Sequence, residues 1–260
     1  MNTAIVVVGA NGRMGRTLVG LAAAAPDLTL AGLVDCGDHL HALAVFGCPA
    51  FDALEKALSD APGAVIIDFT TPEVSLQSAR IAADTGCPLV VGTTGFSDAQ
   101  MRQLREAAQK TPVFWSSNMS VGVNVFLKIL PELTRALGEE YDIELVEMHH
   151  NRKKDSPSGT ALTLMDCLAK ARGWDLDDTR CSSRDGIVGE RPRRQICVQA
   201  VRGGDVVGVH TIYFLGQGER IELCHQAHSR ENFAGGALRA ARWLAGRKPG
   251  KLYGMQDMLS

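Results

Sequence analysis

A glycine-rich turn between an apolar run and a helical segment limits the folds open to this chain more than any other feature. Residues 3–8 are apolar and mostly β-branched, as in a buried parallel strand, and the pattern Gly-x-x-Gly-x-x-Gly follows at residues 9–15. A helical pattern then precedes a second strand at residues 28–34, and Asp35 comes directly after it. This succession is typical of a dinucleotide-binding βαβ unit. The alternative is a glycine turn that serves only the packing of a strand against a helix.

Strand and helix patterns continue to alternate up to residue 115, which predicts a Rossmann-like, doubly wound parallel sheet. The strand patterns at residues 64–69, 89–91 and 112–115 each lead into small polar residues. Ligands of such sheets bind beyond the carboxyl ends of the strands, so we expect a nicotinamide dinucleotide there. The predicted cofactor-binding residues are Gly9, Ala10, Asn11, Gly12, Arg13, Met14, Asp35, Gly92, Thr93, Thr94, Ser116, Ser117, Asn118 and Met119.

The pattern changes after residue 120. The predicted elements of this part are a helix at 123–137 and strands at 141–146, 195–201, 206–215 and 220–227. Short turns that contain glycine separate the last three strands, which predicts hairpins and a mostly antiparallel sheet. We therefore expect an α/β domain at residues 1–120, completed by a C-terminal helix within residues 230–260, and a second α+β domain at residues 121–229.

The connection at residues 147–161 gathers groups suited to proton transfer and to anion binding. It holds the imidazoles of His149 and His150, the cation Lys153, and a helix start at 158–160. Histidine exchanges protons near neutral pH, and the first N–H groups of a helix favour a carboxylate or a phosphate. A solvated basic loop with an ordinary serine cap is the alternative for any single residue, but the combination favours a site.

Charge and cysteine content narrow the classes of function. The formal net charge of -2 gives no support for nucleic-acid binding, and no apolar run approaches the roughly 20 residues of a membrane span. The seven cysteines are scattered and lack a C-x-x-C pair, as in a reducing compartment. Cys224, His225 and His228 lack a second ligand pair, so we expect no metal site. These features predict a cytoplasmic protein that binds neither nucleic acid nor membrane.

The motif Glu147-x-His149-His150-x-x-Lys153-x-Asp155-x-Pro157-Ser158-Gly159-Thr160-Ala161 closely resembles the signature of the dihydrodipicolinate reductase (4-hydroxy-tetrahydrodipicolinate reductase) family. Blocks at residues 9–15, 92–95, 118–124 and 202–210 are similar to further blocks of that family, so the resemblance covers nearly the whole chain. Ser156 stands where many members carry alanine.

The resemblance implies an activity and roles for residues. The reaction would reduce the cyclic imine dicarboxylate derived from 4-hydroxy-tetrahydrodipicolinate to tetrahydrodipicolinate, with NADH or NADPH, in lysine and diaminopimelate biosynthesis. The implied site has His149 as proton donor or acceptor, Lys153 as second proton donor, and His150, Lys153, Ser158, Gly159 and Thr160 around the substrate. A homotetramer assembled through the sheet of the substrate-binding domain at 121–229 is also implied. The alternatives are another two-domain nicotinamide enzyme of amino-acid metabolism and a catalytically silent sensor.

Asp35 also bears on the choice of coenzyme. A carboxylate at the end of the second strand accepts hydrogen bonds from the ribose hydroxyls of NADH and repels the 2′-phosphate of NADPH. The next residues, Cys36, Gly37 and Asp38, carry no positive charge, and Arg13 is the candidate that could offset the repulsion. We therefore expect NADH to be preferred, with NADPH usable.

Overall fold

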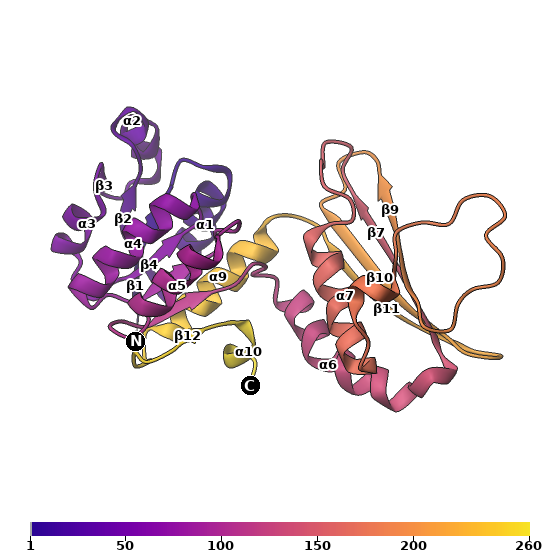
Figure 1. The fold of residues 1–260 in the computed structure, drawn as a ribbon. Helices are drawn as coiled ribbons and strands as arrows, with labels where there is room; N and C mark the ends of the chain where they lie inside the picture. Colours follow the sequence, from indigo (N-terminus) through magenta and orange to yellow (C-terminus); the bar gives the residue numbers. More distant parts are fainter. Residues whose placement is uncertain (1) are drawn as a thin grey trace. The chain divides into compact units, whose positions relative to one another are not determined.

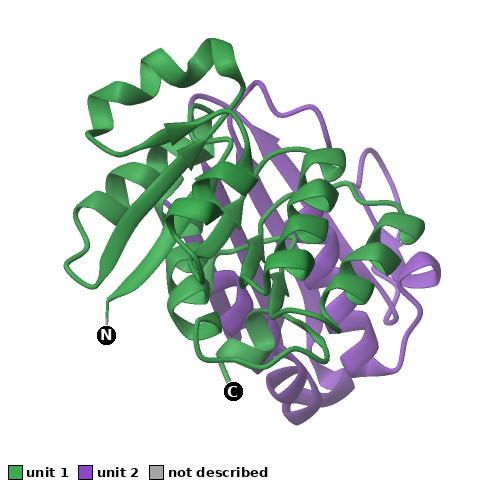
Figure 2. Ribbon diagram, turned by 90° about the vertical axis from the view of Figure 1, so that its left-hand side faces the viewer, with its two compact units in different colours: residues 1–121, 230–260 green, residues 122–229 purple. Residues whose placement is uncertain are grey.

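The computed structural model describes residues 2–260, which form two compact units (Figures 1 and 2). Unit 1 contains the chain up to Val121 together with Arg230–Ser260, and unit 2 contains Gly122–Ser229. None of the helices within residues 2–260 combines the length and the apolarity that a membrane span requires. Unit 2 is thus inserted between two segments of unit 1.

Unit 1 is built on a seven-stranded sheet with the order β12-β6-β5-β4-β1-β2-β3, in which every pairing is parallel. Its strands are β1 (Thr3–Val8), β2 (Leu28–Val34), β3 (Ala50–Phe51), β4 (Val65–Asp68), β5 (Leu89–Val91), β6 (Val113–Trp115) and β12 (Leu252–Tyr253). The chain order reverses at β1, which lies between β2 and β4, and such a reversal opens a crevice at the carboxyl ends of the strands. The predicted Rossmann-like fold class is confirmed.

Helices cover both faces of this sheet. One face packs on α1 (Arg13–Ala23) and α9 (Glu231–Leu244), and the other on α3 (Leu54–Asp60), α4 (Pro72–Thr85) and α5 (Asp98–Ala107). Alternate residues of a strand point to opposite faces, so Ile5 and Val7 join one apolar cluster while Val6 and Val8 join the other. Burial on both faces explains why these strands are continuously apolar. The shorter elements are η1 (Gly37–His39), α2 (Leu40–Leu43), η2 (Ala44–Phe46) and α10 (Met255–Met258).

Unit 2 is a five-stranded sheet with the order β11-β10-β7-β9-β8, and α6 and α7 lie on one of its faces (Figure 1). Its strands are β7 (Asp142–His149), β8 (Arg180–Cys181), β9 (Ile196–Arg202), β10 (Gly208–Leu215) and β11 (Arg220–Ala227). Its helical elements are α6 (Val121–Leu137), η3 (Gly138–Glu140), α7 (Gly159–Arg172) and α8 (Leu176–Thr179). Ile143, Leu145 and Phe214 point from the sheet into the apolar core beneath the two long helices.

One predicted hairpin is wrong. β10 pairs antiparallel with β11, as its glycine turn predicts, but β10 does not pair with β9. β7 lies between them, antiparallel to β10 and parallel to β9. The turn after β9 instead contacts the end of β7, where the Gly203 N–H donates to the His149 carbonyl (2.9 Å). A glycine turn favours reversal of the chain but does not select the neighbouring strand, and here β7 occupies that position.

Candidate active site

The turn after β1 brings its backbone against the start of α1. Gly9 adopts a φ of 71°, a conformation that favours glycine. A Cβ at Gly15 would lie 2.1 Å from the Gly9 carbonyl oxygen, so no side chain fits there. Gly12 directly precedes the first turn of α1, whose N–H groups favour an anion. These residues fit the pyrophosphate of a dinucleotide.

Asp35 follows β2 and is held by this same turn. Its Oδ2 accepts a hydrogen bond from the Asn11 N–H (2.8 Å), and its Oδ1 accepts one from the Cys36 N–H (2.9 Å). His39 Nδ1 lies 2.7 Å from Oδ1. Although partial burial opposes ionisation, the hydrogen bonds from His39, Asn11 and Cys36 lower the pKa of Asp35. The carboxylate is therefore charged at neutral pH.

Asp35 and Gly9 line a cavity of about 430 Å³ within unit 1. Thr70, Ser78 and Leu54 contribute to the same wall. The volume falls within the range typical of small-molecule sites, roughly 300–1,000 Å³. The cavity lies beside the strand ends and fits part of a dinucleotide, with the Asp35 carboxylate available to ribose hydroxyls.

Asp35, Cys36 and His39 also bring three potential metal-ligand atoms within 4.8 Å of one another, the one such group found in residues 2–260. Cys36 Sγ lies 3.1 Å from His39 Nδ1, which is also the nitrogen nearest Asp35. Hydrogen bonds around a single carboxylate account for these distances, so we assign the group to the support of Asp35.

A polar network behind the cavity was not identified from the sequence. Asp68 ends β4, and its carboxylate accepts hydrogen bonds from the hydroxyls of Thr70 (2.6 Å), Ser75 (2.9 Å) and Ser78 (2.7 Å). Burial raises the pKa of Asp68, although these hydroxyl groups favour its charged form. The hydroxyl oxygen of Thr93 lies 2.8 Å from that of Ser75, so this predicted cofactor residue braces the strand ends with its side chain. The sequence signal was an acid at the end of a buried strand.

The predicted cofactor residues at 92–94 and 116–119 follow the ends of β5 and β6. Thr94 and Ser117 are exposed, whereas the Ser116 hydroxyl donates to the Asn118 carbonyl (2.8 Å) and shapes the turn after β6. The Met119 side chain is buried in the apolar cluster under α9, so a part of Met119 in nucleotide binding would fall to its backbone.

In unit 2, β7 ends with an acid–base pair on its buried face. Glu147 and His149 are two residues apart and so point the same way. His149 Nδ1 lies 2.6 Å from Glu147 Oε2. Burial lowers the pKa of His149, although Glu147 opposes the shift. The imidazole is thus neutral at neutral pH and donates its Nδ1–H to the carboxylate.

The Glu147 carboxylate has two further partners. Arg202 at the end of β9 donates to both oxygens, from Nη1 to Oε2 (2.8 Å) and from Nη2 to Oε1 (2.7 Å). The Ser158 N–H donates to Oε1 (3.0 Å). Burial opposes ionisation of Glu147, but the hydrogen bonds from Arg202, His149 and Ser158 lower its pKa. A buried carboxylate with these partners is ionised and rigidly held.

A carboxylate also lies between Lys153 and the start of α7. Lys153 Nζ is 2.9 Å from Asp155 Oδ1. The hydrogen bond from Lys153 lowers the pKa of Asp155, and the backbone of Gly159 contributes in the same direction. The Asp155 side chain is largely exposed, so it occupies an accessible position. The lysine and the first turn of the helix thus form a seat that attracts a carboxylate.

The remaining predicted substrate residues differ in what their side chains offer. His150 is partly buried, and its Nδ1 accepts from the Arg152 N–H (3.2 Å). Thr160 lies in the first turn of α7. The Ser158 hydroxyl is buried, accepts from the Ala161 N–H (3.2 Å) and lies 3.0 Å from His210 Nε2. Ser158 therefore supports the loop with its hydroxyl.

Sequence reasoning gave no role to Glu147, Arg202 or His210, although each lay in a block that resembled the family. For Glu147 and His210 the signal was polarity on the buried face of a strand, because they share that face with the core residues Leu145 and Ile212 of β7 and β10. Polar groups buried in this way require partners. Glu147 finds them in His149 and Arg202, and His210 Nε2 lies beside the Ser158 hydroxyl. Side chains from β7, β9 and β10 therefore support the loop from His149 to Ser158.

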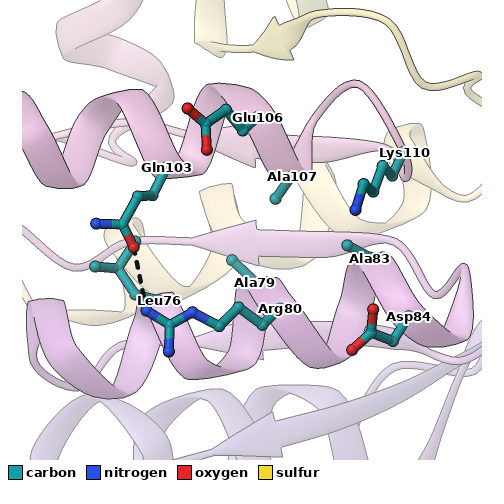
Figure 3. Close-up of a pocket in the computed structure, with 9 residues that line it drawn as sticks. All are labelled: Leu76, Ala79, Arg80, Ala83, Asp84, Gln103, Glu106, Ala107 and Lys110. Atoms are coloured by element: carbon teal, nitrogen blue, oxygen red, sulfur yellow. Dashed lines mark hydrogen bonds between the residues drawn. The ribbon is translucent and has the colours of Figure 1, made fainter.

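A separate hollow of about 270 Å³ lies between α4 and α5, and Figure 3 shows the residues that line it. Arg80 donates to Gln103 Oε1 (3.2 Å) and links the two helices there. The residues that line it include none of the predicted site residues, and we assign it no part in the chemistry.

Comparison with known proteins agrees with this arrangement. Family profiles described as "Dihydrodipicolinate reductase, N-terminus" and "Dihydrodipicolinate reductase, C-terminus" match residues 3–119 and 122–259. The 4-hydroxy-tetrahydrodipicolinate reductase of Desulfovibrio desulfuricans is 68% identical, over 99% of this chain and 100% of its own. That of Oleidesulfovibrio alaskensis is 57% identical, with 100% of both chains covered.

Among solved structures, a dipicolinate-bound dihydrodipicolinate reductase from a Paenisporosarcina species has the same fold. It aligns with a TM-score of 0.78 at 24% identity and with 99% of each chain covered. Both halves of the chain match the two family profiles, and the curated relatives match it from end to end. The chain therefore belongs to the dihydrodipicolinate reductase family.

Proposed function

We infer that the protein is a 4-hydroxy-tetrahydrodipicolinate reductase, an oxidoreductase of lysine and diaminopimelate biosynthesis. Its substrate is the cyclic imine dicarboxylate derived from 4-hydroxy-tetrahydrodipicolinate, and its product is tetrahydrodipicolinate. Relatives with this name at 68% and 57% identity support the inference. The observation that carries the inference is the seat formed by Lys153 and the first turn of α7. This seat holds the Asp155 carboxylate, and it lies close in sequence to the Glu147–His149 pair.

We propose that unit 1 binds the nucleotide and unit 2 the substrate, with residues 1–120 and 230–260 in the first role and 121–229 in the second. Bound NADH or NADPH would supply the hydride. Gly9, Gly15 and Asp35 fit its pyrophosphate and ribose. In unit 2, Lys153 and α7 would bind a substrate carboxylate in place of Asp155. After hydride transfer, the electron-rich carbon of the substrate requires a proton. His149 would act as the proton donor or acceptor, and Lys153 as a second proton donor.

Turnover by the purified protein tests this proposal. Freshly generated substrate should cause loss of NADH absorbance, and tetrahydrodipicolinate should accumulate in equal amount. Pyridine-2,6-dicarboxylate should compete with the substrate, and pyridine-2-carboxylate should inhibit far less because it lacks the second carboxylate. NADH binding without turnover would favour the sensor, and turnover of an unrelated carbonyl substrate would favour another nicotinamide enzyme.

We propose that NADH is the preferred coenzyme, by about tenfold or less in kcat/KM, which corresponds to roughly 1 kcal/mol. The ionised Asp35 supports this preference, because it would repel a 2′-phosphate. Arg13 is exposed, and His39, 2.7 Å from Asp35, is a second group that could offset the repulsion. Initial rates with both coenzymes at low and moderate salt measure the ratio, and a clear NADPH preference would contradict the proposal.

We also propose a cytoplasmic homotetramer assembled through the sheet of unit 2. The face of this sheet opposite α6 and α7 carries partly exposed apolar side chains, among them Met148, Val201, Tyr213 and Leu215. Such a surface suits contact with another copy of the chain. Light scattering should give four times the chain mass of 27.8 kDa, and Val201→Lys should lower the assembled mass.

A further inference from the structure

The hydrogen bond between Glu147 and His149 determines which imidazole nitrogen carries the proton. A neutral imidazole has one N–H, and His149 Nδ1 lies 2.6 Å from the Glu147 carboxylate, which only accepts. The proton is therefore on Nδ1, and Nε2 bears a lone pair. Without the carboxylate, either nitrogen could carry it.

Gly208 on the neighbouring strand β10 leaves space at the other edge of the ring. A Cβ at Gly208 would lie 3.0 Å from His149 Nε2 and 3.4 Å from Cδ2. Nε2 thus points toward the one position on this part of β10 where the chain has no side chain. An alanine there would press against the nitrogen that bears the lone pair.

Arg202 connects the pair to the substrate seat. Besides its two hydrogen bonds to Glu147, its Nη2 donates to the Asp155 carbonyl (2.8 Å). Glu147 Oε1 also accepts the Ser158 N–H, at the start of α7 (3.0 Å). One buried carboxylate therefore contacts the imidazole, the helix start and the guanidinium that holds the Lys153–Asp155 segment.

We propose that Glu147, held by Arg202, is a positioning residue for the reduction: it fixes His149 with its proton on Nδ1 and Nε2 above Gly208, at a constant distance from the carboxylate seat. This proposal rests on the proposed function. The charged and titratable groups around His149 are Glu147 on β7, Arg202 on β9, His210 on β10 (ring centroids 5.2 Å apart) and Lys153 in the connection. Glu147 is the negative group among these four.

Glu147→Gln tests the proposal, because it keeps the shape and removes the charge. NADH binding should change little, and the melting temperature should fall because Arg202 loses its buried carboxylate partner. Beyond this loss of stability, kcat should fall at least tenfold, a part of the roughly 10²–10⁴ that acid–base catalysis contributes. One limb of the kcat–pH profile should belong to His149 and disappear in His149→Gln. In Glu147→Gln this limb should move to lower pH, because Glu147 raises the pKa of His149 and the variant lacks that charge. A merely structural residue would lower stability without moving that limb.

Nitrogen-15 NMR of histidine-labelled protein reads the tautomer directly, with the His149 signal assigned through His149→Gln. The wild-type spectrum should show a protonated Nδ1, and Glu147→Gln should show a mixture of tautomers. Wild-type protein protonated at Nε2, or a variant with unchanged kcat and pH profile, would overturn the proposal. If the wild-type protein shows no turnover, the proposed function is wrong. The NMR spectrum would still test whether Glu147 fixes the tautomer of His149.

If Glu147→Gln does not fold, Gly208→Ala tests the proposed orientation of the His149 ring. Its Cβ should obstruct His149 Nε2 and lower kcat at least tenfold, with NADH binding retained. Gly203→Ala is the matched control: it lies in the adjoining turn, with no atom within 4 Å of its Cβ, and should behave as wild type. Equal kcat values for the two alanine variants would overturn the proposal.

Discussion

The ammonium group of Lys153 lies 2.9 Å from the Asp155 carboxylate, at the position proposed for a substrate carboxylate. Lys153→Ala should lower kcat by at least about a hundredfold, because it removes both a proton donor and a charge from the seat. NADH binding, followed by fluorescence titration, should not change. Lys154→Ala, which alters an exposed neighbour, should retain nearly full activity. An unchanged kcat for Lys153→Ala would remove this residue from the mechanism.

His210 should make stability depend on pH. Burial lowers its pKa to about 4 from the usual 6.5, so between these values the unfolded chain binds more protons than the folded protein. The free energy of unfolding should therefore fall as the pH drops from 6.5 to 4, by up to on the order of 3 kcal/mol. Urea unfolding across this range measures the fall.

His210→Gln should flatten this dependence. Asp68, whose pKa burial raises, contributes the opposite slope but is present in both proteins, so their difference isolates His210. Parallel curves for the two proteins would show that His210 is protonated as easily in the folded state as in the unfolded chain.

At single positions, the sequence was informative where a residue type has few uses. Histidines and a lysine before a Ser-Gly-Thr helix start predicted a site, and in the structure they extend from the last residue of β7 to the first turn of α7. The partners Glu147 and Arg202 could not be paired from the sequence, because they are 55 residues apart and meet only through the β7–β9 register. Such contacts depend on which strands pair across the sheet, and the local sequence pattern carries little information about that pairing.

Among the helices, α9 offers a sharp contrast between two adjacent glycines. A Cβ at Gly236 would lie 1.8 Å from the Met119 carbonyl oxygen, whereas one at Gly235 meets no atom within 4 Å. Gly236→Ala should therefore push α9 off the sheet and cost on the order of 3 kcal/mol of unfolding free energy. Gly235→Ala should stabilise the protein by about 0.5–1 kcal/mol, because alanine favours a helix. Urea unfolding compares the two, and similar losses for both would contradict the contact.

Element by element, the alternation of strand and helix patterns predicted most of the long elements. In the structure, a capping box at Ser97 and Gln100 and a cap at Thr71 fix where two of the helices begin. The order of strands in unit 2 was harder, because β7 competes with a local hairpin for the edges of β9 and β10. The two-residue strands β3, β8 and β12 escaped prediction, since they are too short to show a period.

The whole of unit 1 depends on both ends of the chain. Ala237, Leu238 and Leu244 of α9 belong to the same buried cluster as Ile5 and Val7 of β1. A chain that stops at residue 229 should expose this cluster, bind a hydrophobic dye and lose NADH binding. Removal of Ser260 alone, which is exposed, should have no such effect. NADH binding by the long truncation at wild-type strength would show that the sheet holds without α9.

Insertion of unit 2 between the two segments of unit 1 also sets an order of events on the ribosome. The first 121 residues emerge long before α9 and β12, so one apolar face of the new sheet lacks its cover while residues 122–229 are being made. Unit 2 is one continuous segment and can complete its core first. The N-terminal half would therefore depend on chaperones during synthesis, although it is the first part of the protein to be made.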